Sequence, residues 1–287
     1  MFLDSLATPT RLETLLNLVN GFDDEICTKD DIAFYLQPKG LPDVNPKRQQ
    51  AYDNISAAKS LEILEEKNNL LQFKNADENI IVKEIIINSF DKYIMTKSDG
   101  DRNSIEPWFA LFYSYILGRN EKIESKKSAD WEVRFNNDLF NGIKQTNPFN
   151  STKLTAYLRW YTYLGLGWND NNGVFQLNPF DRINRALLKI FKKDKNLHFD
   201  DFVQALGNVC PELDGGDIFM DANPGWNRDD RNLSLGVSRA LYELHLDKII
   251  TLIGIQDQRN FWNFENINPS LDENIKVPQI SSIKIGQ

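Results

Sequence analysis

The first part of the chain alternates apolar stripes at helical spacing with short polar breaks. Four apolar residues recur every three or four positions: Leu12, Leu15, Leu16 and Val19. This spacing predicts a helix that buries one face. Thr28 is an N-cap residue for a second, shorter helix, and Pro38 ends that helix. Asn45 followed by Pro46 then predicts the start of a third helix over residues 47–59.

A short hairpin is predicted directly after the third helix. Residues 61–65 and 70–73 alternate apolar and polar side chains, and Lys67-Asn68-Asn69 between them tolerates the positive φ of a tight turn. Three helices followed by a hairpin resemble a winged-helix domain, in which the third helix is the recognition helix. We therefore expect residues 1–75 to form a winged-helix domain, a fold that binds DNA in some proteins and protein in others.

The middle of the chain, residues 76–148, has a different pattern. Isoleucines at helical spacing predict a connecting helix over residues 80–96. Residues 107–117 are dense in aromatic side chains and predict a buried helix that is too short to span a membrane. A further helix is expected over residues 131–143. The region is thus predicted to be helical and aromatic-rich.

A second helical, winged-helix-like module is predicted over residues 149–268. Its last helix is capped by Ser234 and precedes two β-prone segments, 249–253 and 261–264, which are predicted to pair as a hairpin. Residues 269–287 are polar and proline-spaced and are assigned to a C-terminal tail. The predicted fold class is therefore mainly α with short β-hairpins (α+β), with tandem winged-helix-like modules joined by the helical middle region.

Composition and charge restrict the functions that such a fold can have. The chain is 41% hydrophobic and 26% charged, which is typical of a folded protein. The net charge of -8 argues against non-specific coating of nucleic acid, so any contact with DNA needs a local basic patch. The start of the sequence does not resemble a signal peptide, and no apolar run has the length of a membrane span. A cytoplasmic protein without membrane contact is expected.

Two clusters of donors are candidates for nucleic-acid binding. The first, at the start of the predicted recognition helix, contains Lys47, Arg48 and Gln50. Acidic residues outnumber basic ones in that domain, which favours a protein-binding use of it. The second cluster contains Arg182, Arg185, Lys189, Lys192 and Lys193. Their spacing predicts one exposed helical face that holds several phosphates, and the alternative is a solvated face without a ligand.

No catalytic site is expected. Asp214, Asp217 and Asp221 surround a Gly-Gly turn and resemble an acidic metal cluster, but their spacing matches no EF-hand loop. A turn with solvated carboxylates is the favoured interpretation. The sequence has only two histidines, and Cys27 and Cys210 lack the spacing of a zinc site. Walker A, GxSxG, HExxH and GxGxxG motifs do not occur in it. We expect neither a metal nor a cofactor.

Several short stretches resemble the DpdG family. They are residues 8–12 (Thr-Pro-Thr-Arg-Leu), 163–168 with 178–181 (Asn-Pro-Phe-Asp), 210–216 (Cys-Pro-Glu-Leu-Asp-Gly-Gly) and 233–241. The resemblance implies a component of bacterial gene clusters that install 7-deazaguanine bases in DNA and restrict unmodified DNA. It implies no catalytic residues. It also implies an accessory role in restriction, with helicase or nuclease subunits of the same defence system as partners.

The sequence as a whole predicts a non-catalytic accessory subunit of a DNA-targeting anti-phage assembly. Such a subunit would contact DNA, partner proteins or both through its winged-helix modules. Two alternatives stay open. One is a protein-protein scaffold that does not bind nucleic acid, and the other is a stand-alone winged-helix transcriptional regulator. A metal-dependent nuclease using Asp214, Asp217 and Asp221 ranks last.

Overall fold

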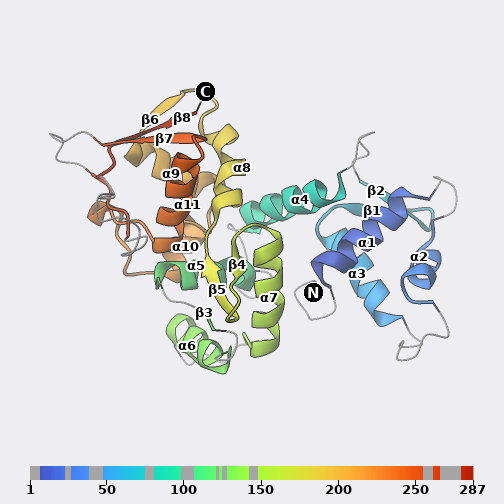
Figure 1. Cartoon of the computed structure of the whole chain (residues 1–287). Helices are drawn as coiled ribbons and strands as arrows, with labels where there is room; N and C mark the ends of the chain where they lie inside the picture. Colours follow the sequence, from blue (N-terminus) through green and yellow to red (C-terminus); the bar gives the residue numbers. More distant parts are fainter. Residues whose placement is uncertain are drawn as a thin grey trace. The chain divides into compact units, whose positions relative to one another are not determined.

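A computed structural model describes residues 7–22, 27–38, 48–74, 81–97, 107–120, 123–124, 128–141, 148–254, 261–265 and 279–286. These residues contain eleven α-helices and eight short strands in three small antiparallel sheets (Figure 1). The predicted α+β class is therefore confirmed. The chain divides into two compact units, Met1–Tyr93 with Asn150–Trp160, and Ile94–Phe149 with Tyr161–Gln287. Among the described helices, none combines the length and the apolar character needed to cross a membrane.

The first unit has the predicted order of three helices and a hairpin. Its elements are α1 (Pro9–Asn20), α2 (Lys29–Leu36), α3 (Gln49–Ser60), β1 (Leu64–Lys67), β2 (Leu70–Phe73), part of α4 (Val82–Lys97) and most of α7 (Ser151–Tyr163). The predicted cap of α2 is confirmed, because the Thr28 side chain accepts a hydrogen bond from the Asp31 backbone N–H at 3.2 Å. The third helix begins at Gln49, two residues later than predicted. Asn45, Pro46 and Lys47 lie outside the described residues.

The hairpin β1–β2 turns where the sequence predicts. Asn68 and Asn69 have φ values of 52° and 65°, the left-handed conformation that asparagine tolerates better than most residues. A third segment joins the hairpin on the far side of β2. Thr28 forms an antiparallel bridge with Leu70, and the Leu71 backbone N–H donates to the Cys27 carbonyl at 2.8 Å. In this unit β2 therefore lies between β1 and the residues that precede α2.

The core of the first unit comes from the predicted apolar stripes. Its fully buried side chains include Leu12, Leu15, Leu16, Ile32, Ala33, Ile55 and Leu71. They come from all three helices and from the hairpin, and α1 packs against both α2 and α3. Burial of these aliphatic side chains is the main favourable term that holds the three helices together.

The second unit contains the remaining helices and two of the sheets. The elements are α5 (Pro107–Gly118), β3 (Ile123–Glu124), α6 (Ser128–Phe140), β4 (Gly167–Asn169), β5 (Val174–Leu177), α8 (Phe180–Ile190), β6 (Asn196–His198), α9 (Phe199–Val209), α10 (Asp217–Ala222), α11 (Leu235–Leu246), β7 (Ile250–Ile253) and β8 (Ser282–Ile285). The strand orders are β3-β5-β4 and β6-β8-β7. The predicted aromatic helix is α5, and it is buried among aromatic rings such as Phe135 and Phe149.

The predicted hairpin of residues 249–253 with 261–264 is wrong. Strand β7 pairs instead with β8, in the segment that we assigned to a tail. Trp262 is fully buried and exchanges backbone hydrogen bonds with Ile280, at 3.0 and 3.1 Å. Strand β8 alternates, with Ile283 buried and Lys284 exposed, which is the pattern of a half-buried strand. It also pairs with β6, so the apparent tail supplies the central strand of its sheet.

The order of elements in the first unit returns in the second. There α8 is followed by β6, α9, α11, β7 and β8 (Figure 1). The last strand, β8, lies between β6 and β7, as β2 lies between β1 and the bridge to Thr28 in the first unit. The second copy differs by an insertion between its second and third helices, which includes α10 and a 3-10 turn, Arg228–Asp230. By this correspondence α11 has the position in the second unit that α3 has in the first.

Candidate nucleic-acid interface

The predicted recognition-helix donors lie around the start of α3. Gln50 is half-buried in its first turn. Arg48 precedes the helix with a left-handed φ of 50°, and its guanidinium carbon lies 5.2 Å from the centre of the Phe34 ring, a cation–π contact. Lys47 lies outside the described residues. The use of these three residues in binding nucleic acid stays a prediction.

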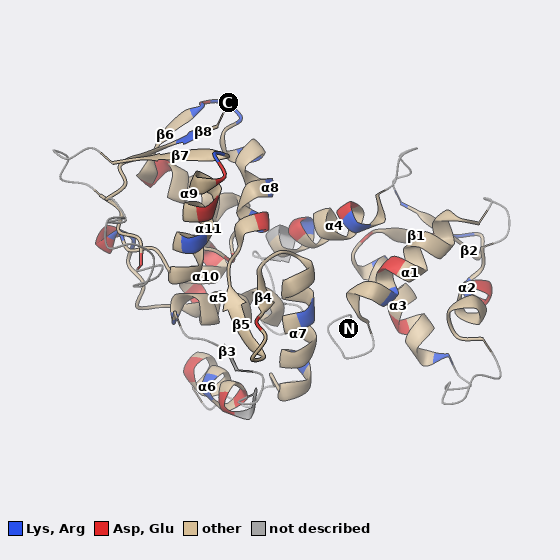
Figure 2. Ribbon diagram, in the orientation of Figure 1, with Lys and Arg blue, Asp and Glu red and all other residues tan. Residues whose placement is uncertain are grey.

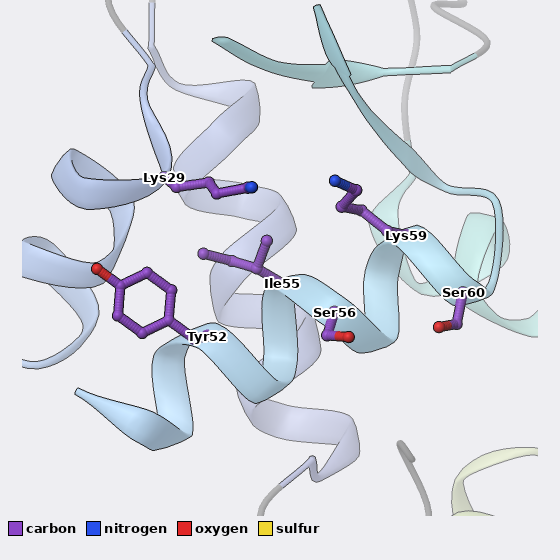
Figure 3. A pocket seen from close by; sticks show the side chains of 6 residues that line it. All are labelled: Lys29, Tyr52, Ile55, Ser56, Lys59 and Ser60. Atoms are coloured by element: carbon purple, nitrogen blue, oxygen red, sulfur yellow. The ribbon is translucent and has the colours of Figure 1, made fainter. Parts of the chain in front are cut away.

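A pocket of about 430 Å³ opens beside α3 in the first unit (Figure 3). It is lined by Lys29, Tyr52, Ile55, Ser56, Lys59 and Ser60. The Lys29 and Lys59 side chains point toward each other from α2 and α3 (Figure 3). Both ammonium groups contact the same atom, Oε2 of Glu66 on β1, at 2.5 Å from Lys29 and 2.8 Å from Lys59. The hydrogen bond from Lys29, followed by that from Lys59, lowers the pKa of Glu66.

The solvent face of α3 also carries acidic partners. The Tyr52 hydroxyl donates to Asp30 Oδ1 at 2.6 Å, and this bond raises the pKa of Tyr52. The Gln49 side-chain amide donates to Asp53 Oδ1 at 2.8 Å. The face is therefore polar and of mixed charge, in agreement with the acidic balance of this part of the sequence.

Arg182 lies in the interior of the second unit, so its predicted place on an exposed phosphate-binding face is wrong. Its side chain is 2% exposed, and Nε donates to Glu212 Oε1 at 2.7 Å. Its Nη2 atom donates to the Val209 carbonyl at 3.1 Å. Arg182 shares its helix face with Ile183 and Ala186, and α8 packs with this face toward α9 and α11. The guanidinium is thus bound to a buried carboxylate and is not accessible to DNA.

The other residues of the basic stretch differ in exposure. Arg185 is half-buried, and its Nη2 donates to the Leu164 carbonyl at 3.1 Å. Lys189, Lys192 and Lys193 are exposed. The accessible part of the predicted patch therefore begins at Lys189, in the last turn of α8, and continues into the turn after it.

The β6-β8-β7 sheet brings two further lysines to this place. At one end of the sheet β6 and β7 begin and β8 ends, since Ile285 donates to the Lys195 carbonyl and Gly286 donates to the Ile249 carbonyl. Exposed lysines gather at this basic end (Figure 2): Lys192, Lys193, Lys195, Lys248 and Lys284. Lys248 and Lys284 were not among the binding residues predicted from the sequence. Only the pairing of β8 with its neighbours places them beside the stretch that follows α8.

The helix α11 is buried to an extent similar to that of α3. Six of its residues are buried: Gly236, Val237, Ser238, Ala240, Leu241 and Leu244. Of the rest, only Leu246 at the helix end is exposed, and α11 packs on α8, α5 and β7. Glu243 on this helix accepts a hydrogen bond from the Asn178 amide at 2.7 Å.

The three aspartates of the Gly-Gly turn do not converge. Asp214 is fully buried and accepts hydrogen bonds from the Ser234 backbone N–H at 2.6 Å and from its hydroxyl at 2.7 Å. Burial raises the pKa of Asp214 to about 6, against the lowering effect of these donors. Asp217 and Asp221 are exposed. In the part of the chain that is described, no group of three His, Cys, Asp or Glu residues is placed to hold a metal ion.

Comparison with known proteins gives one match. The model of the DpdG-like family matches residues 3–258, which is most of the chain. The matched part contains the first unit and the second unit as far as β7. No curated protein and no solved structure matches the chain.

Proposed function

The chain belongs to the DpdG-like family, and from this premise we propose that it is a non-catalytic accessory subunit of a cytoplasmic, DNA-targeting defence assembly. Membership associates the chain with the system that places 7-deazaguanine bases in DNA and restricts DNA without them. In this proposal the catalytic work belongs to partner subunits of the helicase or nuclease type. The role of the chain is to contact DNA and those partners.

The observation that carries the proposal is the element order that both units share. A helix, a short strand segment, two helices and two strands, with the last strand in the middle, is the order of a winged-helix domain. We propose that both units are winged-helix modules. Such modules are common in proteins that bind nucleic acid, and proteins also use them to bind other proteins.

The two modules have different tasks in this proposal. In the first, α3 has a polar solvent face beside an open pocket, which suits contact with DNA. In the second, exposed lysines gather at the basic end of the sheet, and we propose that contact with DNA uses that end. Lysines at that end address phosphates, which position a protein on DNA without reading its sequence.

Salt-dependent binding of duplex DNA by the full chain tests this proposal. Replacing both Lys192 and Lys193 with glutamate should weaken binding equally for all sequences. It should also make the slope of log affinity against log salt concentration shallower by about 2. The matched control replaces Lys83 and Arg159 with glutamate, since both are exposed and belong to the first unit, not to the unit with the basic end. Equal effects of the two double variants, measured by fluorescence anisotropy, would count against the basic end.

The second candidate is a protein-protein scaffold that does not bind DNA. It is favoured by the net charge of -8 and by two exposed aromatic residues on α2, Phe34 at 46% and Tyr35 at 56%. Two results together would favour the scaffold role over the DNA role. Neither the chain nor its complex would bind DNA at any salt concentration, and Tyr35→Ala would reduce the recovery of partner proteins from the host.

A further inference from the structure

Two lysines that line a pocket in the first unit share one carboxylate, which belongs to a residue outside the pocket lining. Lys29 and Lys59 both contact Oε2 of Glu66, so one negative charge faces two positive ones. The lining also includes the side chains of Ser56 and Ser60, and its volume is about 430 Å³. Figure 3 shows the two lysine side chains pointing toward each other, whereas the Ser56 and Ser60 hydroxyls on α3 point away from them.

We propose that this pocket is a phosphate site for the DNA backbone, and that Glu66 is an internal competitor for the two lysines that line it. The inference rests on the proposed function for its ligand, because it takes the phosphate to be part of DNA. A phosphodiester offers more acceptor oxygens than the single carboxylate oxygen that both lysines now contact. Its separate oxygens can accept from both ammonium groups at the same time.

The carboxylate is held loosely enough to be displaced. The side chains of Lys29 and Lys59 are 39% and 37% exposed, and that of Glu66 is 23% exposed. Exposed ion pairs contribute little to stability, so exchanging the carboxylate for a phosphate costs the fold little. Asp30 is the other acidic group on the rim, where it accepts from Tyr52. The negative charge of Asp30 repels a phosphate near Tyr52. The phosphate is therefore expected to bind where the two lysines meet.

The neighbouring glutamate on the same strand provides a matched control. Glu65 precedes Glu66 on β1 and pairs with Lys67 at 2.5 Å and with the Gln72 amide at 3.0 Å, not with the pocket lysines. Glu65→Gln and Glu66→Gln therefore remove the same charge from adjacent positions. General electrostatic attraction predicts equal gains in DNA affinity, whereas displacement of a competitor predicts a gain specific to Glu66→Gln.

The test measures duplex DNA binding and inorganic phosphate binding by the full chain in three forms: the parent, Glu66→Gln and Glu65→Gln. The Ile55 methyl signal in an NMR titration reports on the pocket, because Ile55 lines it. We expect Glu66→Gln to bind DNA at least about threefold more tightly than Glu65→Gln. Phosphate should shift the Ile55 signal at lower concentration in Glu66→Gln. Adding Lys29→Ala and Lys59→Ala to that variant should abolish both gains.

Four other results of this test would contradict the proposal or a part of it. If Glu66→Gln and Glu65→Gln bind DNA and phosphate with equal affinity, the proposal that Glu66 is a competitor is overturned. Phosphate binding in the pocket with no gain in DNA affinity overturns DNA as the ligand. An oligoglutamate peptide that shifts the Ile55 signal as strongly as phosphate overturns the preference for phosphate. If no form binds DNA, the proposed function fails, whereas specific phosphate binding by Glu66→Gln still upholds the pocket as an anion site.

Discussion

Replacing Arg182 with methionine is expected to destabilise the second unit strongly. Arg182 and Glu212 are 2% and 1% exposed, and Glu212 Oε2 is buried without a hydrogen-bond partner even when the arginine is present. Methionine fills much of the arginine volume but leaves a buried carboxylate without its counter-charge. Removing one partner of a buried ion pair costs about 3–5 kcal/mol. This is a large part of the roughly 5–15 kcal/mol by which domains are stable.

Urea unfolding followed by far-ultraviolet circular dichroism measures this cost. Arg185→Met is the control on the same helix, because that guanidinium is half-buried and its hydrogen bond to the Leu164 carbonyl, made by a charged donor, is worth about 1.5–3 kcal/mol. The double variant Arg182→Met/Glu212→Leu should recover much of the loss, since apolar residues often replace a buried ion pair at little cost. The reasoning is refuted if Arg182→Met lowers the unfolding free energy no more than Arg185→Met does.

Two further predictions concern the same unit. The folded pKa of Asp214, about 6, exceeds its ordinary value of 3.8, so the folded state holds this proton more tightly. Its contribution to the unfolding free energy therefore falls as pH rises from about 4 to about 6. Asp214→Asn should remove this fall in urea titrations across that range, and an unchanged slope would contradict the assignment. Ile283 is fully buried in β8, so Ile283→Ala should cost about 2–5 kcal/mol, whereas Lys284→Ala at the exposed neighbouring position should change stability by about 0.5 kcal/mol or less. Equal losses by calorimetry would contradict the strand register.

Local signals in the sequence were sufficient for the three helices and the hairpin of the first unit. The Thr28 cap, the Asn68-Asn69 turn and the apolar stripe of α1 act over a few residues, so each could be recognised without knowledge of the fold. The element order and the α+β class followed from them. The roles of residues whose contacts lie far away in the sequence could not be predicted from such local signals.

The candidate site shows the same limit. Arg182 has the charge and spacing of a surface residue, and only the fold shows that Glu212 lies beneath it. Lys248 and Lys284 lie at the basic end because β8 pairs with β6 and β7. This pairing was not predicted, because the polar residues before β8 made the segment resemble a tail. Glu66 is unremarkable in the sequence, because its importance comes from two lysines on two different helices. Strand pairing and buried ion pairs are tertiary contacts, and periodicity does not encode them.

The central position of β8 has a consequence for how the second unit folds. Asn196 on β6 pairs with Lys284, and Ile250 on β7 pairs with Ile285, so the sheet closes only when segments far apart in the chain meet. Contacts of such sequence separation form slowly, because the entropy of closing the intervening loops is lost before any strand pairing is gained. Until then β6 and β7 have free edges, which are prone to pair with other chains. Partner subunits or chaperones that cover these edges during synthesis would therefore raise the yield of folded protein.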